Sequence, residues 1–288
     1  MGMADVVPGV SGGTMAFILG IYEELIAAIR SFDLYFLRLI SGFRMKDALG
    51  HVSWQFLVAV LCGIFAAIFS LARALSWVLH HHPILIWSFF FGLILASVLV
   101  VSRHIDKWAI PLAACMFLGL LGGYLLVGMV PVSTPDSFWF LFLCGAVAIC
   151  AMILPGISGS FILVLLGKYE YILEAVNNRD VIVLFVVAGG AVIGLLSFVR
   201  LLNWLLKRYH EPTIAVLTGL MLGSLRKVWP WKRTLDTVTD RHGSEMVLSQ
   251  TNIFPGHWDK EVMSAICLMV IGFLVVFFLH IWAEKKKK

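Results

Sequence analysis

The sequence contains little charge for its length. Asp, Glu, Lys and Arg make up only 14% of its 288 residues, whereas soluble domains carry roughly 25%. Hydrophobic residues account for 60% of the chain, and the mean hydropathy is +0.94. This composition excludes a soluble globular fold. Because about 20 apolar residues are needed to cross a bilayer, the length accommodates roughly six to ten membrane segments.

Cysteine is also scarce and lacks the spacing of a metal site or a disulfide framework. The five cysteines all lie in apolar runs, with no Cys-x-x-Cys or Cys/His pattern, which is typical of buried thiols that fill space. Three adjacent histidines, His80 to His82, fall on one short turn and do not form a defined ligand set. We therefore expect no metal ion and no other cofactor.

The chain is basic, with a net charge of +5, but its basic residues are scattered through short loops and a tail, Lys285 to Lys288. A nucleic-acid-binding patch is therefore not expected, and anionic headgroups of membrane lipids are the expected partner. One group resembles an aromatic belt with basic anchors at the membrane surface. It comprises Trp229, Trp231 and Trp258 with Lys227, Lys232 and Arg233.

Eight apolar regions account for the membrane elements. Pro8-Gly9 and Pro155-Gly156 interrupt two of them midway, and such breaks are typical of re-entrant hairpins, which we expect over residues 4–30 and 137–176. The other six have the length and hydropathy of full crossings. They are Val52–Leu79, Ile84–Ser102, Trp108–Val130, Val181–Leu206, Thr213–Trp229 and Val262–Ala283.

Residues 31–47 differ from the membrane segments because apolar and charged residues alternate at helical spacing. Phe32, Phe36, Leu39 and Phe43 fall on one side, whereas charged residues take other positions. The pattern predicts an amphipathic helix on the membrane surface.

The two halves of the chain contain related motifs. A shift of 147 residues aligns Pro8–Gly13 with Pro155–Ser160, and it also aligns the Leu-Gly-x-Tyr-Glu motifs that end at Glu23 and Glu170. A second shift, of 127 residues, aligns a Gly, Ser, Arg and Trp pattern around Arg73 with one around Arg200. The difference between the two shifts matches the surface helix, which only the first half contains.

Each half is therefore expected to be a re-entrant hairpin followed by three crossings. Because three is odd, the second half enters the membrane upside down, and the fold class is an all-α integral membrane protein of two inverted-topology repeats. The repeats are residues 1–130 and 131–288, and residues 226–260 form an outer loop.

Lysine and arginine positions give an independent prediction of orientation. With the C-terminus in the cytoplasm, the inner segments Arg30–His51, Arg103–Lys107 and Lys207–Glu211 are all basic. The outer turns His80–Pro83 and Pro131–Asp136 contain no Lys or Arg, and the outer turn Asn177–Asp180 contains one. This distribution follows the positive-inside rule. The outer loop, which contains six basic residues, departs from the rule.

The repeated Pro-Gly-x-Ser-Gly turns are candidate anion-binding sites. Glycine allows close approach of a ligand to backbone N–H groups, and a helix that starts there adds partial positive charge. Hydroxyl groups supply further donors. The alternative is that these small residues only let membrane helices pack closely. The candidate residues are Gly9, Ser11, Gly12, Gly13 and Thr14 in the first turn, and Gly156, Ser158, Gly159 and Ser160 in the second.

Ionisable residues repeat as well. Arg73 and Arg200 occupy equivalent helical positions, and a guanidinium in lipid is costly enough that we expect it either to contact phosphate or to snorkel to the interface. Glu23 and Glu170 can pair with arginine, carry a coupling proton or cap a loop. Tyr22, Tyr169 and Asp5 complete the candidate coupling or gating residues.

The motifs resemble one bacterial family. Ala4–Thr14, Leu19–Glu23 and Leu154–Ser160 are similar to the family long known as domain of unknown function 368, whose members are described as undecaprenyl-phosphate translocases. The resemblance implies a non-enzymatic flippase in the bacterial inner membrane, which returns the lipid carrier of cell-wall synthesis to the cytoplasmic leaflet. It also implies that the paired turns and arginines hold the phosphate while the prenyl tail stays in lipid.

Two other functions remain open at the sequence level. Membrane undecaprenyl-pyrophosphate phosphatases share broken inverted repeats and a Pro-Gly-x-Ser-Arg-Ser motif, but Gly12 and Gly159 stand where that arginine would be. An ion or small-anion transporter without a lipid substrate is the other alternative. A coupling proton or sodium ion and a homo-oligomer are compatible with all three functions.

Overall fold

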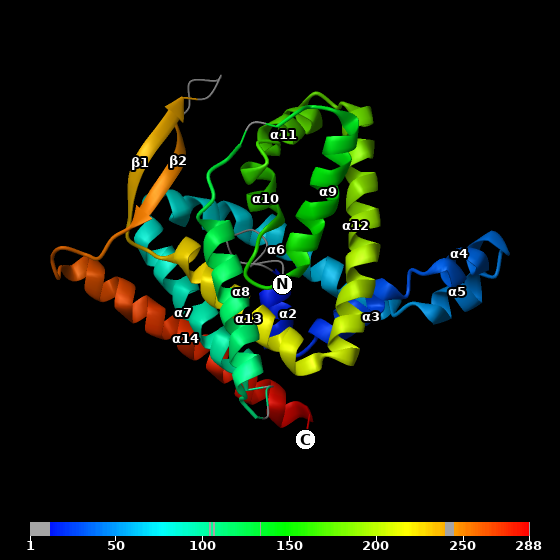
Figure 1. Ribbon diagram of the computed structural model, residues 1–288, viewed down its shortest axis with the longest axis horizontal. Coiled ribbons are helices and arrows are strands. Elements are labelled where there is room, and N and C mark those ends of the chain that lie inside the picture. Colours follow the sequence, from blue (N-terminus) through cyan, green and yellow to red (C-terminus); the bar gives the residue numbers. More distant parts are fainter. Residues whose placement is uncertain (1–11, 104, 106, 133, 240–244, 288) are drawn as a thin grey trace.

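The computed structural model describes residues 12–103, 105, 107–132, 134–239 and 245–287, and helices form most of it (Figure 1). The helices are α2 Gly12–Ile18, α3 Tyr22–Arg30, α4 Leu34–Ser41, α5 Met45–His51, α6 Trp54–His81, α7 Pro83–Ser102, α8 Ile110–Val127, α9 Phe138–Ile153, α10 Gly159–Leu165, α11 Tyr169–Asn177, α12 Val181–Arg208, α13 His210–Val228 and α14 Lys260–Lys287. The strands β1 Lys232–Thr239 and β2 Glu245–Asn252 form one antiparallel hairpin.

The predicted crossings are all helical. Five helices are long and apolar enough to cross a membrane, namely α6, α7, α8, α12 and α14. The helix α13 forms where a sixth crossing was expected, but it is not among these five and carries charge in both its first and last turns. The helix α9, in the second predicted hairpin, is apolar but only 16 residues long.

Small residues bring the long helices together in pairs. The helix α13 packs along α8, α14 along α7, and α12 along α9 (Figure 1). A Cβ atom on Gly219 would lie 2.0 Å from the carbonyl oxygen of Met116, and one on Gly190 would lie 1.9 Å from that of Phe142. The backbones therefore approach as closely as they do at other small-residue contacts between membrane helices.

The motif segments form two short helix pairs of matching length. The helices α2 and α10 each have seven residues, and α3 and α11 each have nine. Gly20 and Gly167 join the helices of each pair with φ values of 67° and 63°, a conformation that glycine adopts without steric cost. The repeated Leu-Gly dipeptide thus has the same backbone function in both halves.

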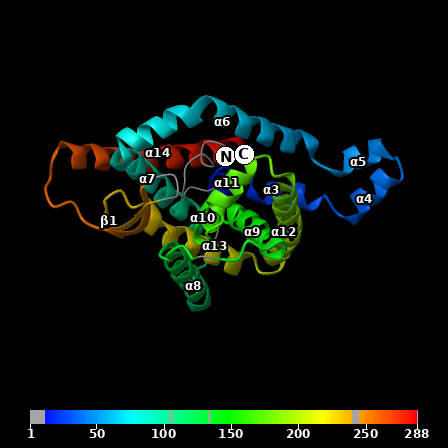
Figure 2. The same ribbon diagram turned by 90° about the horizontal axis from the view of Figure 1, so that it is seen from above.

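The long helices that follow the two pairs match in length but not in surroundings. Both α6 and α12 have 28 residues. Gly190 of α12 contacts α9, whereas the equivalent Gly63 of α6 has nothing within 4 Å of its Cβ position. Figure 2 shows α6 along one edge of the molecule, whereas α12 lies against α9. The similarity of the two halves therefore extends to their elements but not to all their contacts.

The predicted surface helix over residues 31–47 is wrong in detail, because two helices, α4 and α5, replace it. The chain breaks at Gly42 and Phe43, where Phe43 has a φ of 54°. The two helices bury Phe36 and Leu39 against Ala48 and Val52, so part of the apolar face is covered by the chain itself. Phe43 remains 91% exposed.

The β-hairpin was not predicted within the outer loop of residues 226–260. Its strands contain β-branched residues, among them Thr234, Thr237 and Val247, which favour extended structure. Two hydrogen bonds tie its base to the end of α13: Trp229 Nε1 donates to Ile253 O at 2.9 Å, and Asn252 Nδ2 donates to Arg226 O at 2.9 Å.

Candidate functional site

Thr14, on α2 directly after the first copy of the turn motif, contacts the second copy in the structure. The backbone N–H of Gly156 donates to the hydroxyl oxygen of Thr14 at 3.0 Å, and Thr14 is fully buried. Gly12 and Gly13, which precede Thr14 on α2, are also buried. The candidate residues Asp5, Gly9 and Ser11 lie outside the described part of the chain.

Gly156 must be glycine for two reasons. Its φ of +89° is unfavourable for other residues, and a Cβ there would lie 2.8 Å from Ser224 Oγ and 3.0 Å from Met221 Cα. Gly159 is similarly tight, because its Cβ would lie 2.6 Å from Ala148 O. At these two glycines, the small residue therefore does allow close packing, which was the alternative to anion binding.

The hydroxyl groups of the second turn remain near the surface. Ser158 and Ser160 share a hydrogen bond of 2.7 Å between their Oγ atoms. Ser158 is partly buried and Ser160 is exposed. The second turn therefore presents two adjacent hydroxyls at the start of α10, where a hydrogen-bonding ligand can reach them.

Tyr22 provides a second link between the halves. Its hydroxyl donates to Ile153 O at 3.2 Å, and its ring stacks on Phe17 with centroids 4.0 Å apart. The equivalent Tyr169 is 39% exposed on α11. The tyrosine of the repeated Tyr-Glu motif thus has a different environment in each copy. Tyr22 joins α3 to the end of α9.

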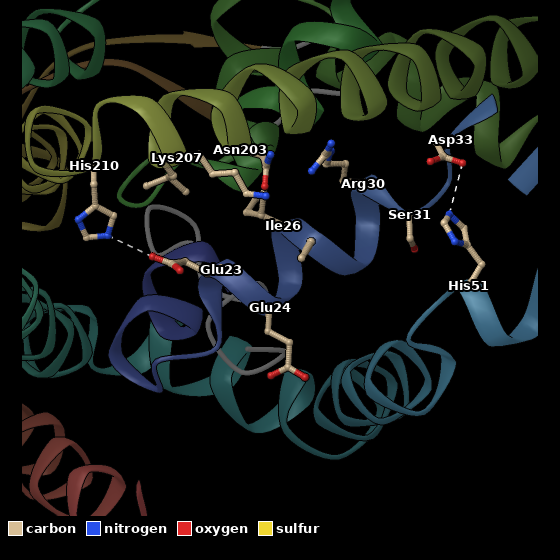
Figure 3. A pocket seen from close by; sticks show the side chains of 12 residues that line it. Glu23, Glu24, Ile26, Arg30, Ser31, Asp33, His51, Asn203, Lys207 and His210 are labelled. Atoms are coloured by element: carbon tan, nitrogen blue, oxygen red, sulfur yellow. Dashed lines mark hydrogen bonds and ion pairs between the residues drawn. The ribbon is translucent and has the colours of Figure 1, made fainter. Parts of the chain in front are cut away.

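A polar cavity of about 640 Å³ lies beside α3 (Figure 3). Glu23 pairs there with His210 of α13, Oε1 to Nε2, at 3.2 Å. Arg30 and Lys207 bring positive charge to the same cavity. At its edge, the N–H of Phe36 donates to Asp33 Oδ1 at 2.8 Å, and this bond holds the pKa of Asp33 below its usual value.

Arg200 lines a neighbouring cavity. This cavity, about 510 Å³, is lined by Arg200, Arg30, Lys207 and Asn203, among others. The structure therefore groups Arg200 with the basic residues at the end of α12. The side chain of the equivalent Arg73 lies outside the described part of the chain, and Glu170 lies in the first turn of α11.

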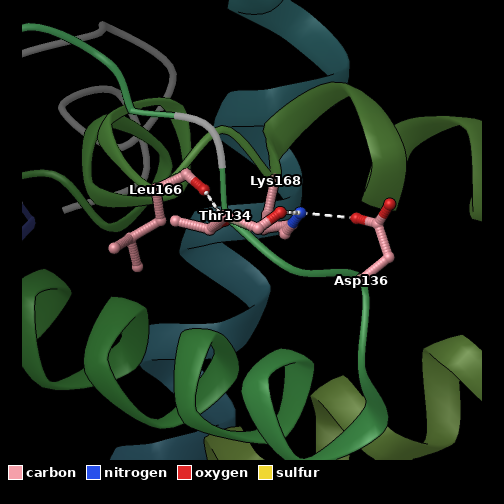
Figure 4. Close-up of polar contacts among 4 residues, drawn as sticks. All are labelled: Thr134, Asp136, Leu166 and Lys168. Atoms are coloured by element: carbon pink, nitrogen blue, oxygen red, sulfur yellow. Dashed lines mark hydrogen bonds and ion pairs between the residues drawn. The ribbon is translucent and has the colours of Figure 1, made fainter.

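Sequence reasoning missed Lys168, which follows the positive-φ Gly167 (Figure 4). The Lys168 side chain is 3% exposed, and its Nζ donates to Thr134 O at 2.6 Å and to Asp136 Oδ1 at 2.5 Å. The signal was present, because the first copy of the motif has Ile21 at this position. The lysine fixes the segment before α9 to the second hairpin.

The sequence predicted Lys227 and Lys232 as basic anchors of an aromatic belt at the membrane surface, and in the structure both are partly buried. Lys227 Nζ lies 4.7 Å from the ring centroid of Phe161 on α10, and Lys232 Nζ lies 4.8 Å from that of Trp87 on α7. Lys227 therefore contacts the helix that begins at the second turn. Within the described residues, no three His, Cys, Asp or Glu side chains come together to hold a metal ion.

Long apolar helices and two linked, broken helix pairs define a multi-pass α-helical membrane protein. A family model described as VCA0040-like, undecaprenyl phosphate translocase-like, matches residues 1–246. The chain belongs to this family, for which domain of unknown function 368 is the older name, and the prediction of family is confirmed.

Two curated relatives have the same name. A Vibrio cholerae protein named polyprenyl-phosphate transporter is 42% identical over 291 residues, which cover 99% of this chain and 94% of the relative. A Staphylococcus aureus protein with that name is 28% identical over 251 residues, which cover 80% of this chain and 83% of the relative. No solved structure matches the chain significantly.

Proposed function

We propose that this protein carries a polyprenyl phosphate from one leaflet of a bacterial cytoplasmic membrane to the other. The names of both relatives support this substrate class, and the family description points to undecaprenyl phosphate. Transport toward the cytoplasmic leaflet is the direction that would recycle the lipid carrier for cell-envelope synthesis. The protein acts as a transporter and leaves the phosphate ester intact.

The observation that carries the proposal is the contact between the two motif copies. Thr14 of the first turn accepts a hydrogen bond from Gly156 of the second at a buried position. Two sequence-related turns that meet inside a membrane protein provide one shared polar site for a charged headgroup. The hydroxyls of Ser158 and Ser160 lie on the same turn as Gly156 and supply donors to a phosphate oxygen.

The two halves then act as inverted repeats, residues 1–130 and 131–288. The equal lengths of α2 and α10, of α3 and α11, and of α6 and α12 support this proposal. In transporters of this kind, one repeat rocks against the other around a site near the bilayer midplane. The phosphate would cross through this polar site, whereas the prenyl tail would remain in lipid throughout.

The basic cavities at the end of α12 provide the next contact for the phosphate. Arg30, Arg200 and Lys207 line these cavities, and under the positive-inside orientation they face the cytoplasm. Beside these cavities, the carboxylate of Glu23 pairs with the imidazole of His210, Oε1 to Nε2, at 3.2 Å. We propose this pair as the site where a coupling proton binds.

A leaflet-resolved transport assay tests the proposal. The purified protein is reconstituted in liposomes with a fluorescent polyprenyl phosphate, and a membrane-impermeant quencher reports the outer-leaflet fraction over time. We expect protein-dependent exchange between leaflets that responds to a proton gradient. Parallel measurements follow phosphate release from a prenyl pyrophosphate and the flux of soluble anions.

Variants connect the transport to the site. Ser160→Ala should slow the exchange about three- to tenfold, which corresponds to the loss of one hydrogen bond to the headgroup. Ser264→Ala, which removes an exposed hydroxyl on α14, serves as the matched control. Phosphate release without lipid exchange would identify a phosphatase, and soluble-anion flux without lipid exchange would identify an ion transporter. Either result contradicts the proposal.

A further inference from the structure

Two partly buried lysines lie next to each other at the end of α13. Lys232 Nζ donates to the backbone oxygen of Lys227 at 2.5 Å. Each ammonium group also faces an aromatic ring, Trp87 for Lys232 and Phe161 for Lys227. A backbone carbonyl and two aromatic rings stabilise these cations, but none of these three groups carries a full negative charge.

The positive charge of this lysine pair lacks a carboxylate partner in the described part of the chain. The ion pairs found there involve Asp33, Asp47, Asp136 and Glu23, none of which contacts either lysine. Burial and the neighbouring Lys227 lower the pKa of Lys232 to about 8. Ammonium groups that are partly removed from water are unfavourable unless an anion compensates their charge.

The lysine pair adjoins the second motif turn. Lys227 lies one helical turn after Ser224, the residue whose Oγ limits the space at Gly156. Phe161, which Lys227 contacts, directly follows Ser160 on α10. A phosphate bound between the lysines would therefore lie close to the motif, on the side away from the basic cavities at the end of α12.

The neighbouring surface is suited to a lipid. Arg226 precedes Lys227 and lines a cavity of about 470 Å³ together with Phe91, Leu222 and Trp229. The guanidinium of Arg226 is held over the Tyr124 ring, 4.4 Å from its centroid. Cationic side chains thus lie beside apolar ones at this end of the helix. A ligand with an anionic headgroup and a hydrocarbon tail requires both kinds of surface.

We propose that Lys227 and Lys232 together bind the phosphate of a prenyl phosphomonoester beside the second motif turn. The identity of the lipid rests on the proposed function, whereas the binding of a phosphomonoester by the lysine pair does not. This site would hold the headgroup at the opposite end of the pathway from Arg30, Arg200 and Lys207. The predicted belt lysines thereby become substrate ligands.

Binding of farnesyl phosphate to the purified full-length chain tests the proposal by isothermal titration calorimetry. Lys227→Met and Lys232→Met should each weaken binding about 10- to 100-fold, the loss expected for a charge-assisted hydrogen bond. Arg233→Met, which removes an exposed charge from the adjacent position of β1, is the matched control and should bind like the wild type. Equal affinities in all four proteins would overturn the proposal.

Two further readouts separate ligand binding from a structural function. Because each lysine is a partly buried cation without a counterion, both Met variants should melt at or above the wild-type temperature in the absence of ligand. A large drop in melting temperature in both variants would identify structural lysines and overturn the proposal. Size-exclusion chromatography confirms that each variant remains monodisperse.

The pH dependence supplies a signature of Lys232. A phosphomonoester becomes a dianion above about pH 6, and Lys232 loses its charge above about pH 8, so affinity should peak between these values. Of the groups that face Lys232, the Trp87 ring is uncharged, and Lys227 is a second ammonium group that can also lose its proton at alkaline pH. Lys232→Arg should lose less affinity than the wild type at about pH 9.5, because arginine stays protonated. If the affinity of Lys232→Arg falls at alkaline pH as steeply as that of the wild type, Lys232 is not a phosphate ligand.

The choice of ligand separates this inference from the proposed function. Weak binding of inorganic phosphate and of farnesol, beside tight binding of farnesyl phosphate, supports a lipid headgroup site. Inorganic phosphate that binds as tightly as farnesyl phosphate would overturn the lipid assignment in favour of free phosphate. If farnesyl phosphate binds in a lysine-dependent way but liposomes show no lipid exchange, the proposed function is wrong and the binding site is still supported.

Discussion

At the scale of single residues, Gly156 shows why the motif needs glycine. Ala at this position must adopt a positive φ, which costs roughly 1–2 kcal/mol for residues other than glycine. Its methyl group also meets the backbone of Met221 at 3.0 Å, and backbone cannot move aside cheaply. We expect Gly156→Ala to destabilise the protein by at least about 2 kcal/mol in detergent, measured by thermal or denaturant unfolding.

Gly50 is the matched control for this substitution. It lies on α5 with nothing within 4 Å of its Cβ position, so alanine there has space and a better helix propensity. Gly50→Ala should therefore leave stability unchanged or raise it slightly. Equal loss of stability in both variants would show that the turn conformation at Gly156 is not special.

Sequence patterns predicted which residues form the turns but not the function of each one. The repeat identified Thr14 and Gly156 as related features, yet only the fold reveals that they bond to each other. The same limit applies to Arg200 and Lys227. The repeat aligned Arg200 with Arg73, but contacts between distant segments decide which cations adjoin the turn.

At the scale of secondary-structure elements, one buried lysine joins the second hairpin to the segment before α9. Lys168 is 3% exposed but Asp136 is 61% exposed. Asp136→Asn leaves a buried ammonium without its counterion, whereas Lys168→Met leaves a carboxylate that water solvates. We therefore expect Asp136→Asn to lower the melting temperature more than Lys168→Met does.

Solvent limits the size of this effect. Because Asp136 is mostly exposed, water screens part of the attraction, and we expect Asp136→Asn to cost on the order of 1–2 kcal/mol. Calorimetry of both purified variants measures the order of the two losses. A larger loss in Lys168→Met would mean that the hydrogen bond to Thr134, rather than the ion pair, fixes this segment.

The long helices could be predicted from the sequence because hydropathy is a local property. The apolar stretches that predicted α7, α8 and α12 agree with the helices to within a few residues. The break between α4 and α5 could not be predicted, because it depends on how Phe36 and Leu39 pack on Ala48. The β-hairpin was not predicted, because its strands are polar and lack the apolar alternation that marks a half-buried strand.

At the scale of the whole molecule, orientation in the membrane is the property most open to direct measurement. The positive-inside rule predicts that the turn after α11 is outside and the segment between α7 and α8 is inside. In a background without the native cysteines, Asn178→Cys should react with a membrane-impermeant maleimide in intact cells. Lys107→Cys should react only after permeabilisation. Labelling of both from one side would contradict the inverted arrangement.

The contact between Thr14 and Gly156 also defines the most direct test of the central claim, that the two motif copies act together in lipid transport. The measurement is the initial rate of polyprenyl-phosphate exchange between leaflets in liposomes for Thr14→Val and Thr14→Ser. Valine has the shape of threonine but leaves the buried N–H of Gly156 without its acceptor, whereas serine keeps the acceptor. We expect at least about tenfold slower exchange for Thr14→Val and near wild-type exchange for Thr14→Ser. Wild-type exchange by a correctly folded Thr14→Val protein would contradict it.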